Sequence, residues 1–368
     1  MQFARTEAKD LKTYTCQCGN TLYFANSQCL SCQRPVGFLS DAKVISSCDI
    51  DADGNWIAGH NGQAYRQCSN YSKQNICNWL VPVESDYKLC PSCQLTDTIP
   101  DLSKPDNVKL WFRMEQAKRH LLYTLYKLKL PVIGKRHNPR GLSFRFLEDE
   151  VAQALYGREL TVQNTVLTGH SNGVITINLK EAEETKRLAM RELMNERYRT
   201  LIGHFRHESG HYYWDVLIKG SQYIEAFRAL FGDERKDYQQ SLENYYANGP
   251  AADWQQRCIS AYASMHPWED WAETWAHYLH MVDTLETANE YETSLENRLL
   301  SNPLNADHPH TASYNEESFD TLIDDWDQLT NLLNSLNNSM GLDDAYPFVI
   351  NDKTREKLHF IHLLVRPL

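Results

Sequence analysis

Two histidines four residues apart lie in LIGHFRHESGHYYWDVLI, residues 201–218, with a glutamate directly after the first histidine. If this stretch is a helix, positions i and i+4 share one face, so His207 and His211 can reach the same metal ion. Glu208 is offset around the helix and can stand beside a water that a zinc ion acidifies toward a pKa of ~7. The spacing predicts a hydrolytic zinc site with Glu208 as general base, but the same five letters also occur by chance in core helices.

A catalytic zinc site needs a third protein ligand, because its fourth position stays open for water. The residues after His211, YYWDVLIKG, lack the histidine that a metzincin places there. A gluzincin instead takes a glutamate from a later helix. The segment HPWEDWAETWAHYLHM offers Glu269 and Glu273 on one face of an apolar helix that Pro267 can begin. We predict that Glu269 is the third ligand and that Glu273 orients a ligand histidine from behind; the alternative is that both carboxylates are solvated.

Several other polar residues are weaker candidates. His204 lies one turn before the first ligand and can support it from behind, or it can be a satisfied core histidine. His277 and His280 rank below Glu269 as ligands. Tyr262 lies about two helical turns before Glu269 if that helix extends back so far, and its hydroxyl could stabilise the oxyanion of a tetrahedral intermediate. We therefore name Tyr262 as a catalytic candidate.

Nine of the ten cysteines fall within residues 16–93, and two sets of four suit tetrahedral zinc bound by thiolates. The first set is Cys16, Cys18, Cys29 and Cys32, and the second is Cys68, Cys77, Cys90 and Cys93. The two remaining thiols, Cys48 and Cys258, are expected to be small buried apolar residues. The cysteine pattern predicts two structural zinc ions beside one catalytic zinc ion, and a reducing, cytoplasmic location.

The cysteine-rich segment ends near residue 100, which divides the chain into residues 1–100 and 101–368. Residues 104–130 have apolar side chains at helical spacing up to Pro131 and are expected to form a connecting helix. The segments GLSFRF and GVITINL indicate strands, and GVITINL could be the sheet edge that pairs with an extended peptide. The pattern predicts an α+β chain: a double zinc ribbon, then a mainly helical catalytic domain with a small sheet.

Charge is distributed unevenly along the chain, whose net charge is -11. Residues 1–100 carry 8 Lys or Arg against 9 Asp or Glu, so the ribbon lacks the basic surface that phosphate binding needs. Residues 104–145 have a balance of +9 and residues 264–345 a balance of -16, so the two regions could face each other, or the acidic one could rim a site for cationic peptides. The start of the chain lacks the apolar core of a signal peptide, and no run approaches the ~18 apolar residues of a membrane helix.

Taken together, the stretches GHFRHESGHYYWD, HPWEDWAETWAHYLH, CNWLVP, LCPSCQLTDTIPDL and MGLDDAYPFVI resemble a bacterial family of zinc-binding metallopeptidases with an N-terminal zinc ribbon. The resemblance implies a gluzincin-like domain in which His207, His211 and Glu269 hold zinc and Glu208 is the general base. It departs from many gluzincins in having Glu273 where they have aspartate.

We therefore expect a zinc-dependent peptidase that acts on a peptide or protein substrate, without nucleic acid or membrane, and with a protein partner able to bind the ribbon. The rival is a non-catalytic zinc-binding adaptor on a zincin fold. A binding-only site has no use for the general base, so the presence of Glu208 favours the enzyme.

Overall fold

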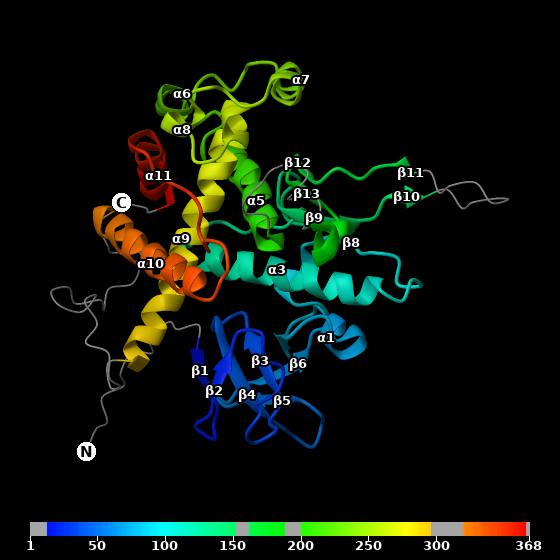
Figure 1. Cartoon of the computed structure of the whole chain (residues 1–368). Helices are drawn as coiled ribbons and strands as arrows, with labels where there is room; N and C mark the ends of the chain where they lie inside the picture. Colours follow the sequence, from blue (N-terminus) through cyan, green and yellow to red (C-terminus); the bar gives the residue numbers. More distant parts are fainter. Residues whose placement is uncertain (1–12, 152–161, 188–199, 296–318, 366–368) are drawn as a thin grey trace. The chain divides into compact units, whose positions relative to one another are not determined.

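The computed structural model describes residues 13–151, 162–187, 200–295 and 319–365 of the 368 in the chain (Figure 1). The chain divides into two compact units: residues 1–94 with 286–311, and residues 95–285 with 312–368. We call them the first and the second unit and describe each by itself. No helix in the described ranges is long and apolar enough to cross a membrane.

The first unit is built around a closed five-stranded barrel of short strands. The strands are β3 (Val36–Leu39), β4 (Val44–Ile50), β5 (Trp56–Ala58), β6 (Ala64–Gln67) and β7 (Trp79–Pro82). Neighbours pair antiparallel, except that β3 and β7 close the barrel in parallel. Phe38, Tyr65 and Trp79 fill its interior and are at most 1% exposed. The hairpin of β1 (Thr13–Thr15) and β2 (Thr21–Tyr23) and the short helices α1 (Ser69–Gln74) and α2 (Pro91–Gln94) carry or flank the cysteines.

The second unit is mainly helical and holds one four-stranded sheet in the order β12-β13-β9-β8. These strands are β8 (Thr96–Thr98), β9 (Ser143–Leu147), β12 (Gly169–Ser171) and β13 (Val174–Asn178). The expectation that GVITINL forms a sheet edge is wrong, because β13 pairs with β12 on one side and β9 on the other. The edge belongs to β12, a strand too short and polar to be recognised from its letters. A separate ladder joins β10 (Glu150–Val151) to β11 (Val162–Asn164).

Several helices of the second unit lie where the sequence predicts them, but the helical pattern expected from residue 253 to about 285 is interrupted between α8 and α9. Helix α3 (Asn107–Lys127) lies within the predicted range 104–130. The others are α5 (Leu201–Leu217), α6 (Ile224–Phe231), α7 (Tyr238–Asn248), α8 (Trp254–Arg257), α9 (Pro267–Leu295), α10 (Phe319–Ser339) and α11 (Asp352–Val365), with 3-10 turns η1 (Leu179–Ala182) and η2 (Tyr262–Ser264). The composition of residues 180–219 predicts two helices; the second corresponds to α5, and residues 188–199 lie outside the described residues. The chain is therefore α+β, with a strand-rich ribbon region before a mostly helical one.

Helix α5 lies between the sheet and α9, and aromatic and small side chains fix it there (Figure 1). The Phe205 ring packs against Phe144 and Phe146 of β9, with ring centroids 5.8 and 6.1 Å apart. On its other side Gly210 lets α5 approach α9 closely, and the Trp271 indole donates a hydrogen bond to the Gly210 carbonyl at 2.8 Å. The helix that carries the two histidines thus packs against the sheet on one side and against α9 on the other.

Candidate metal centre

The two histidines of the motif project from the same face of α5. The Thr200 side chain caps the helix by accepting a hydrogen bond from the Gly203 amide, so α5 begins at Leu201. His207 and His211 then lie one turn apart in the middle of the helix, and their ring centroids are 4.9 Å apart. The local sequence alone dictates this arrangement, because i and i+4 side chains meet on any helix.

Glu269 reaches both histidines from the first turn of α9, which begins at Pro267 as predicted. Its Oε2 lies 3.0 Å from His207 Nε2, and its Oε1 lies 3.3 Å from His211 Nε2. One donor atom from each of the three residues lies within 4.8 Å of the other two. Burial alone would raise the pKa of Glu269, but the adjacent His211 and His207 rings bring it well below its usual range.

We call His207, His211 and Glu269 the trio. Their geometry fits a bound zinc ion better than it fits a set of hydrogen bonds among the three side chains. Within the described residues, the buried Glu269 Oε2 has no hydrogen-bond partner although His207 Nε2 is only 3.0 Å away. Two imidazole nitrogens and a carboxylate are a usual protein donor set for a catalytic zinc. The three side chains can therefore hold one zinc ion between α5 and α9.

Glu208 points into the same region without joining the trio. It is 7% exposed, and its Oε2 is buried without a hydrogen-bond partner among the described residues. Burial raises the pKa of Glu208, and the nearby His207 and His211 rings offset part of that rise. A buried carboxylate with a raised pKa and an unengaged oxygen is suited to accept and return a proton.

Glu273 contacts the far side of the His207 ring, one helical turn after Glu269. The Nδ1–H group of His207 donates a hydrogen bond to Glu273 Oε1 at 2.7 Å. The Ser260 hydroxyl donates a hydrogen bond to Glu273 Oε2, also at 2.7 Å. Burial would raise the pKa of Glu273, but the hydrogen bond from His207 lowers it to about 2. An ionised carboxylate on Nδ1 fixes the ring orientation and leaves Nε2 facing the trio.

His204 and the later histidines take other partners. His204 precedes His207 by one turn of α5, and its Nδ1 lies 3.2 Å from Glu181 Oε2 of η1. His277 Nδ1 pairs with the Tyr346 hydroxyl at 2.8 Å, and His280 Nδ1 pairs with the Arg206 guanidinium at 2.8 Å. Within the described ranges, neither His277 nor His280 belongs to a cluster that could hold an ion.

Two tyrosines lie beside the trio, one predicted and one not. Tyr262 lies on the separate turn η2, so the continuous helix back from Glu269 does not exist; its ring is nevertheless 6.2 Å from the His207 ring. Tyr238 of α7 donates a hydrogen bond to Glu269 Oε1 at 3.0 Å. Burial raises the pKa of both phenols, which keeps them protonated donors. Tyr238 has no sequence signal, because it lies 31 residues before Glu269 in another helix.

Two further residues with rings close to His211 were not predicted from the sequence. Trp268 covers its ring with centroids 4.0 Å apart, and His170 of the edge strand β12 is 6.5 Å away. Burial lowers the pKa of His170 to about 4, and its Nε2 accepts the Gly173 amide hydrogen at 2.9 Å. The edge strand thus runs close to the second histidine of the trio.

The first unit gathers the cysteines into the two predicted sets of four. The sets are Cys16, Cys18, Cys29 and Cys32, and Cys68, Cys77, Cys90 and Cys93. Sulfur pairs lie 3.5 to 3.7 Å apart, close to the ~3.8 Å edge of a tetrahedron with Zn–S distances of ~2.3 Å. All ten cysteines are free thiols, and Cys48 and Cys258 are buried apart from both sets.

Two clusters of four cysteines and a trio of two histidines and a glutamate are donor sets typical of a zinc-binding protein with a ribbon region and a helical region. Residues 107–364 match the model of a family described as "Putative zinc-binding metallo-peptidase", and residues 13–104 match that of a zinc-ribbon domain. The chain belongs to this family of zinc-binding metallo-peptidases.

Relatives of similar length occur in mycobacteria. Proteins from Mycobacterium bovis and from two strains of Mycobacterium tuberculosis are each 40% identical to this chain over 350 residues, which is 95% of this chain and 93% of the relative. All three are named as uncharacterized proteins. No solved structure matches the chain.

Proposed function

We propose that the protein is a zinc-dependent peptidase of the gluzincin type, in which His207, His211 and Glu269 hold one catalytic zinc ion. The eight clustered cysteines would hold two structural zinc ions. The single observation that carries the proposal is Glu208, a buried carboxylate with an unengaged oxygen beside the trio. A site that only bound zinc, as in an adaptor, would have no need of it.

The residues of the chain divide the work of peptide hydrolysis. A bound zinc would supply the Lewis acid that polarises the scissile carbonyl and acidifies the attacking water. Glu208 would take the proton from that water and deliver it to the leaving amine. Glu273 would hold His207 in position. Tyr262 or Tyr238 would donate a hydrogen bond to the oxyanion.

The substrate is proposed to be an extended peptide or a segment of a protein. The outer edge of β12 has no strand partner in the described sheet and lies beside His211, so it can pair with a peptide backbone. The charge balance of residues 1–100 disfavours nucleic acid, and their zinc clusters are better explained as supports for a protein-contact surface.

The test compares Glu208→Gln with Glu225→Gln, the same change at a glutamate whose side chain is 78% exposed on α6. Each protein is incubated with a mixture of unstructured peptides, and cleavage is followed by mass spectrometry alongside zinc content. We expect Glu208→Gln to keep all its zinc and to lose about 10²- to 10⁴-fold in rate, while Glu225→Gln cleaves like wild type. A zinc-loaded wild type that cleaves nothing, or equal rates for both variants, would favour the adaptor.

A further inference from the structure

The segment between α8 and η2 supplies one support of the metal centre. Ser260 in this segment donates its hydroxyl hydrogen to Glu273, which in turn holds the His207 ring at 2.7 Å. The cap residue of α8, Cys258, already has an extended backbone with φ -127° and ψ 155°. The position of this short segment therefore sets how well Glu273 is held.

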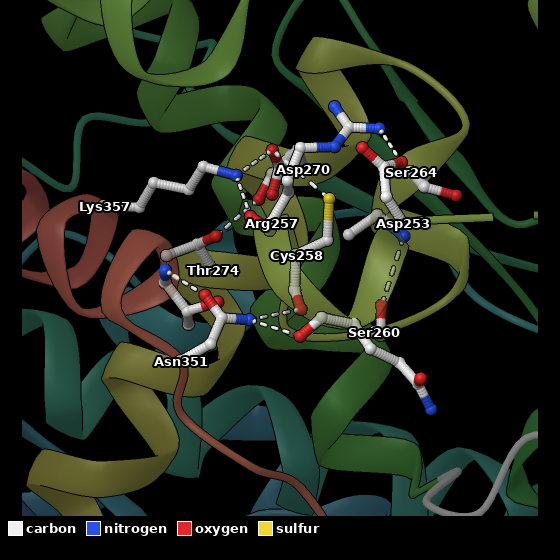
Figure 2. A network of polar contacts seen from close by, with 12 residues as sticks. Asp253, Arg257, Cys258, Ser260, Ser264, Asp270, Thr274, Asn351 and Lys357 are labelled. Atoms are coloured by element: carbon white, nitrogen blue, oxygen red, sulfur yellow. Dashed lines mark hydrogen bonds and ion pairs between the residues drawn. The ribbon is translucent and has the colours of Figure 1, made fainter. Parts of the chain in front are cut away.

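Asn351, directly before α11, ties this segment down with its side-chain amide (Figure 2). Its Nδ2 donates to the Gln255 carbonyl at 2.9 Å and to the Cys258 carbonyl at 3.3 Å. Its Oδ1 accepts the Thr354 amide hydrogen at 2.8 Å, as a helix cap does. The two ends of one amide thus serve different purposes, because the oxygen caps α11 and the nitrogen holds the segment.

Lys357 of α11, six residues after Asn351, makes a second attachment (Figure 2). Its ammonium group donates to the Arg257 carbonyl at 2.5 Å and to Asp270 Oδ2 at 2.6 Å. Both side chains of the Lys357–Asp270 pair are 5% exposed. A buried pair of this kind adds little net stability, but here the one ammonium group links the Arg257 carbonyl to the Asp270 carboxylate. Asp270 directly follows Glu269 in α9, so the attachment joins α8 and α11 to the helix of the third ligand.

We propose that α11 is a positioning element of the metal centre, acting through Asn351 and Lys357 on the segment that carries Ser260. Neither residue belongs to the trio, so each acts on His207 only through Ser260 and Glu273 or through the backbone of α9. The inference rests on the proposed metal centre and predicts that a change far along the sequence alters its zinc affinity.

Asn351→Asp separates the two purposes of the side chain. Aspartate caps helices as well as asparagine, so α11 is expected to keep its start. The donor to Gln255 and Cys258 is lost, and a carboxylate oxygen then faces their carbonyls. We expect zinc affinity at the centre to fall about tenfold, the lower end of the range for residues that orient a ligand. Asn331→Asp, at an exposed asparagine of α10, is the matched charge control.

The affinity is measured by competition with a chelator, for the one zinc ion that His211→Ala loses. Ser260→Ala is expected to weaken this zinc by a similar factor, and the double variant Asn351→Asp/Ser260→Ala no more than the weaker-binding single variant. Such non-additivity is expected of residues that act along one route and not of a general loss of stability. Wild-type affinity in Asn351→Asp, or additive losses, would overturn the positioning role. If His211→Ala loses no zinc ion, the proposed metal centre itself is wrong.

Discussion

Gly210, beside the second histidine, is a position where two opposing effects predict opposite signs of a stability change. In an open helix, replacing glycine by alanine stabilises by about 0.5–1 kcal/mol, because the backbone loses less entropy on folding. Here an added Cβ would lie 2.9 Å from the Ala272 Cα and 3.2 Å from the Trp275 Cβ. These are backbone and near-backbone atoms of α9, so they cannot move aside as the end of a flexible side chain would.

The packing effect is expected to win. Overpacking a close-packed interior typically costs 1–3 kcal/mol, which exceeds the gain in helix propensity. We predict that Gly210→Ala lowers the free energy of unfolding by about 1–2 kcal/mol. Because α5 and α9 must then separate by a few tenths of an ångström, His211 also moves away from Glu269, and metal sites tolerate only about 0.2 Å of misplacement.

The assay is urea unfolding of Gly210→Ala, combined with chelator competition for the zinc of the trio. The pair Asn331→Ala and Asn331→Gly, at an exposed position of α10, measures the helix propensity difference within the same protein. We expect that difference to be about 1 kcal/mol in favour of alanine, and the change at Gly210 to have the opposite sign. A Gly210→Ala protein that is more stable than wild type and binds zinc equally well would refute the packing argument.

Two further predictions concern buried titratable and metal-binding groups. Burial lowers the pKa of His277 from 6.5 to about 4. Between these two pH values the ring is neutral in the folded protein and protonated in the unfolded chain. Its contribution is therefore complete above pH 6.5 and is lost as pH falls toward 4, by about 3 kcal/mol in all, and His277→Gln should flatten the stability profile measured in urea between these pH values. In the first unit, Cys90→Ser should remove one zinc ion and lower the unfolding midpoint of that unit, because a structural zinc site contributes directly to folding; unchanged zinc content by mass spectrometry would contradict the assignment of Cys90 to a zinc site.

Most of the helical framework could be read from the sequence, since it depends on local periodicity and on residues that begin or end helices. The apolar spacing over residues 104–130 corresponds to α3, and Pro267 begins α9. The five-stranded barrel could not be read in this way. Its strands are three to seven residues long, and its closure depends on the parallel pairing of β3 with β7, in which Phe38 pairs with Trp79, 41 residues later.

In the candidate site, too, some features follow from the local sequence and others from the packing of distant segments. The sequence by itself determined which side chains could be metal ligands. His207 and His211 share one face of any helix, and eight cysteines fall into two closely spaced sets of four. Only the tertiary structure decided that Tyr238 bonds Glu269, that Ser260 bonds Glu273, and that α11 holds the segment carrying Ser260. The physical reason is that hydrogen bonds between distant segments depend on how whole helices pack, and neighbouring letters do not encode that packing.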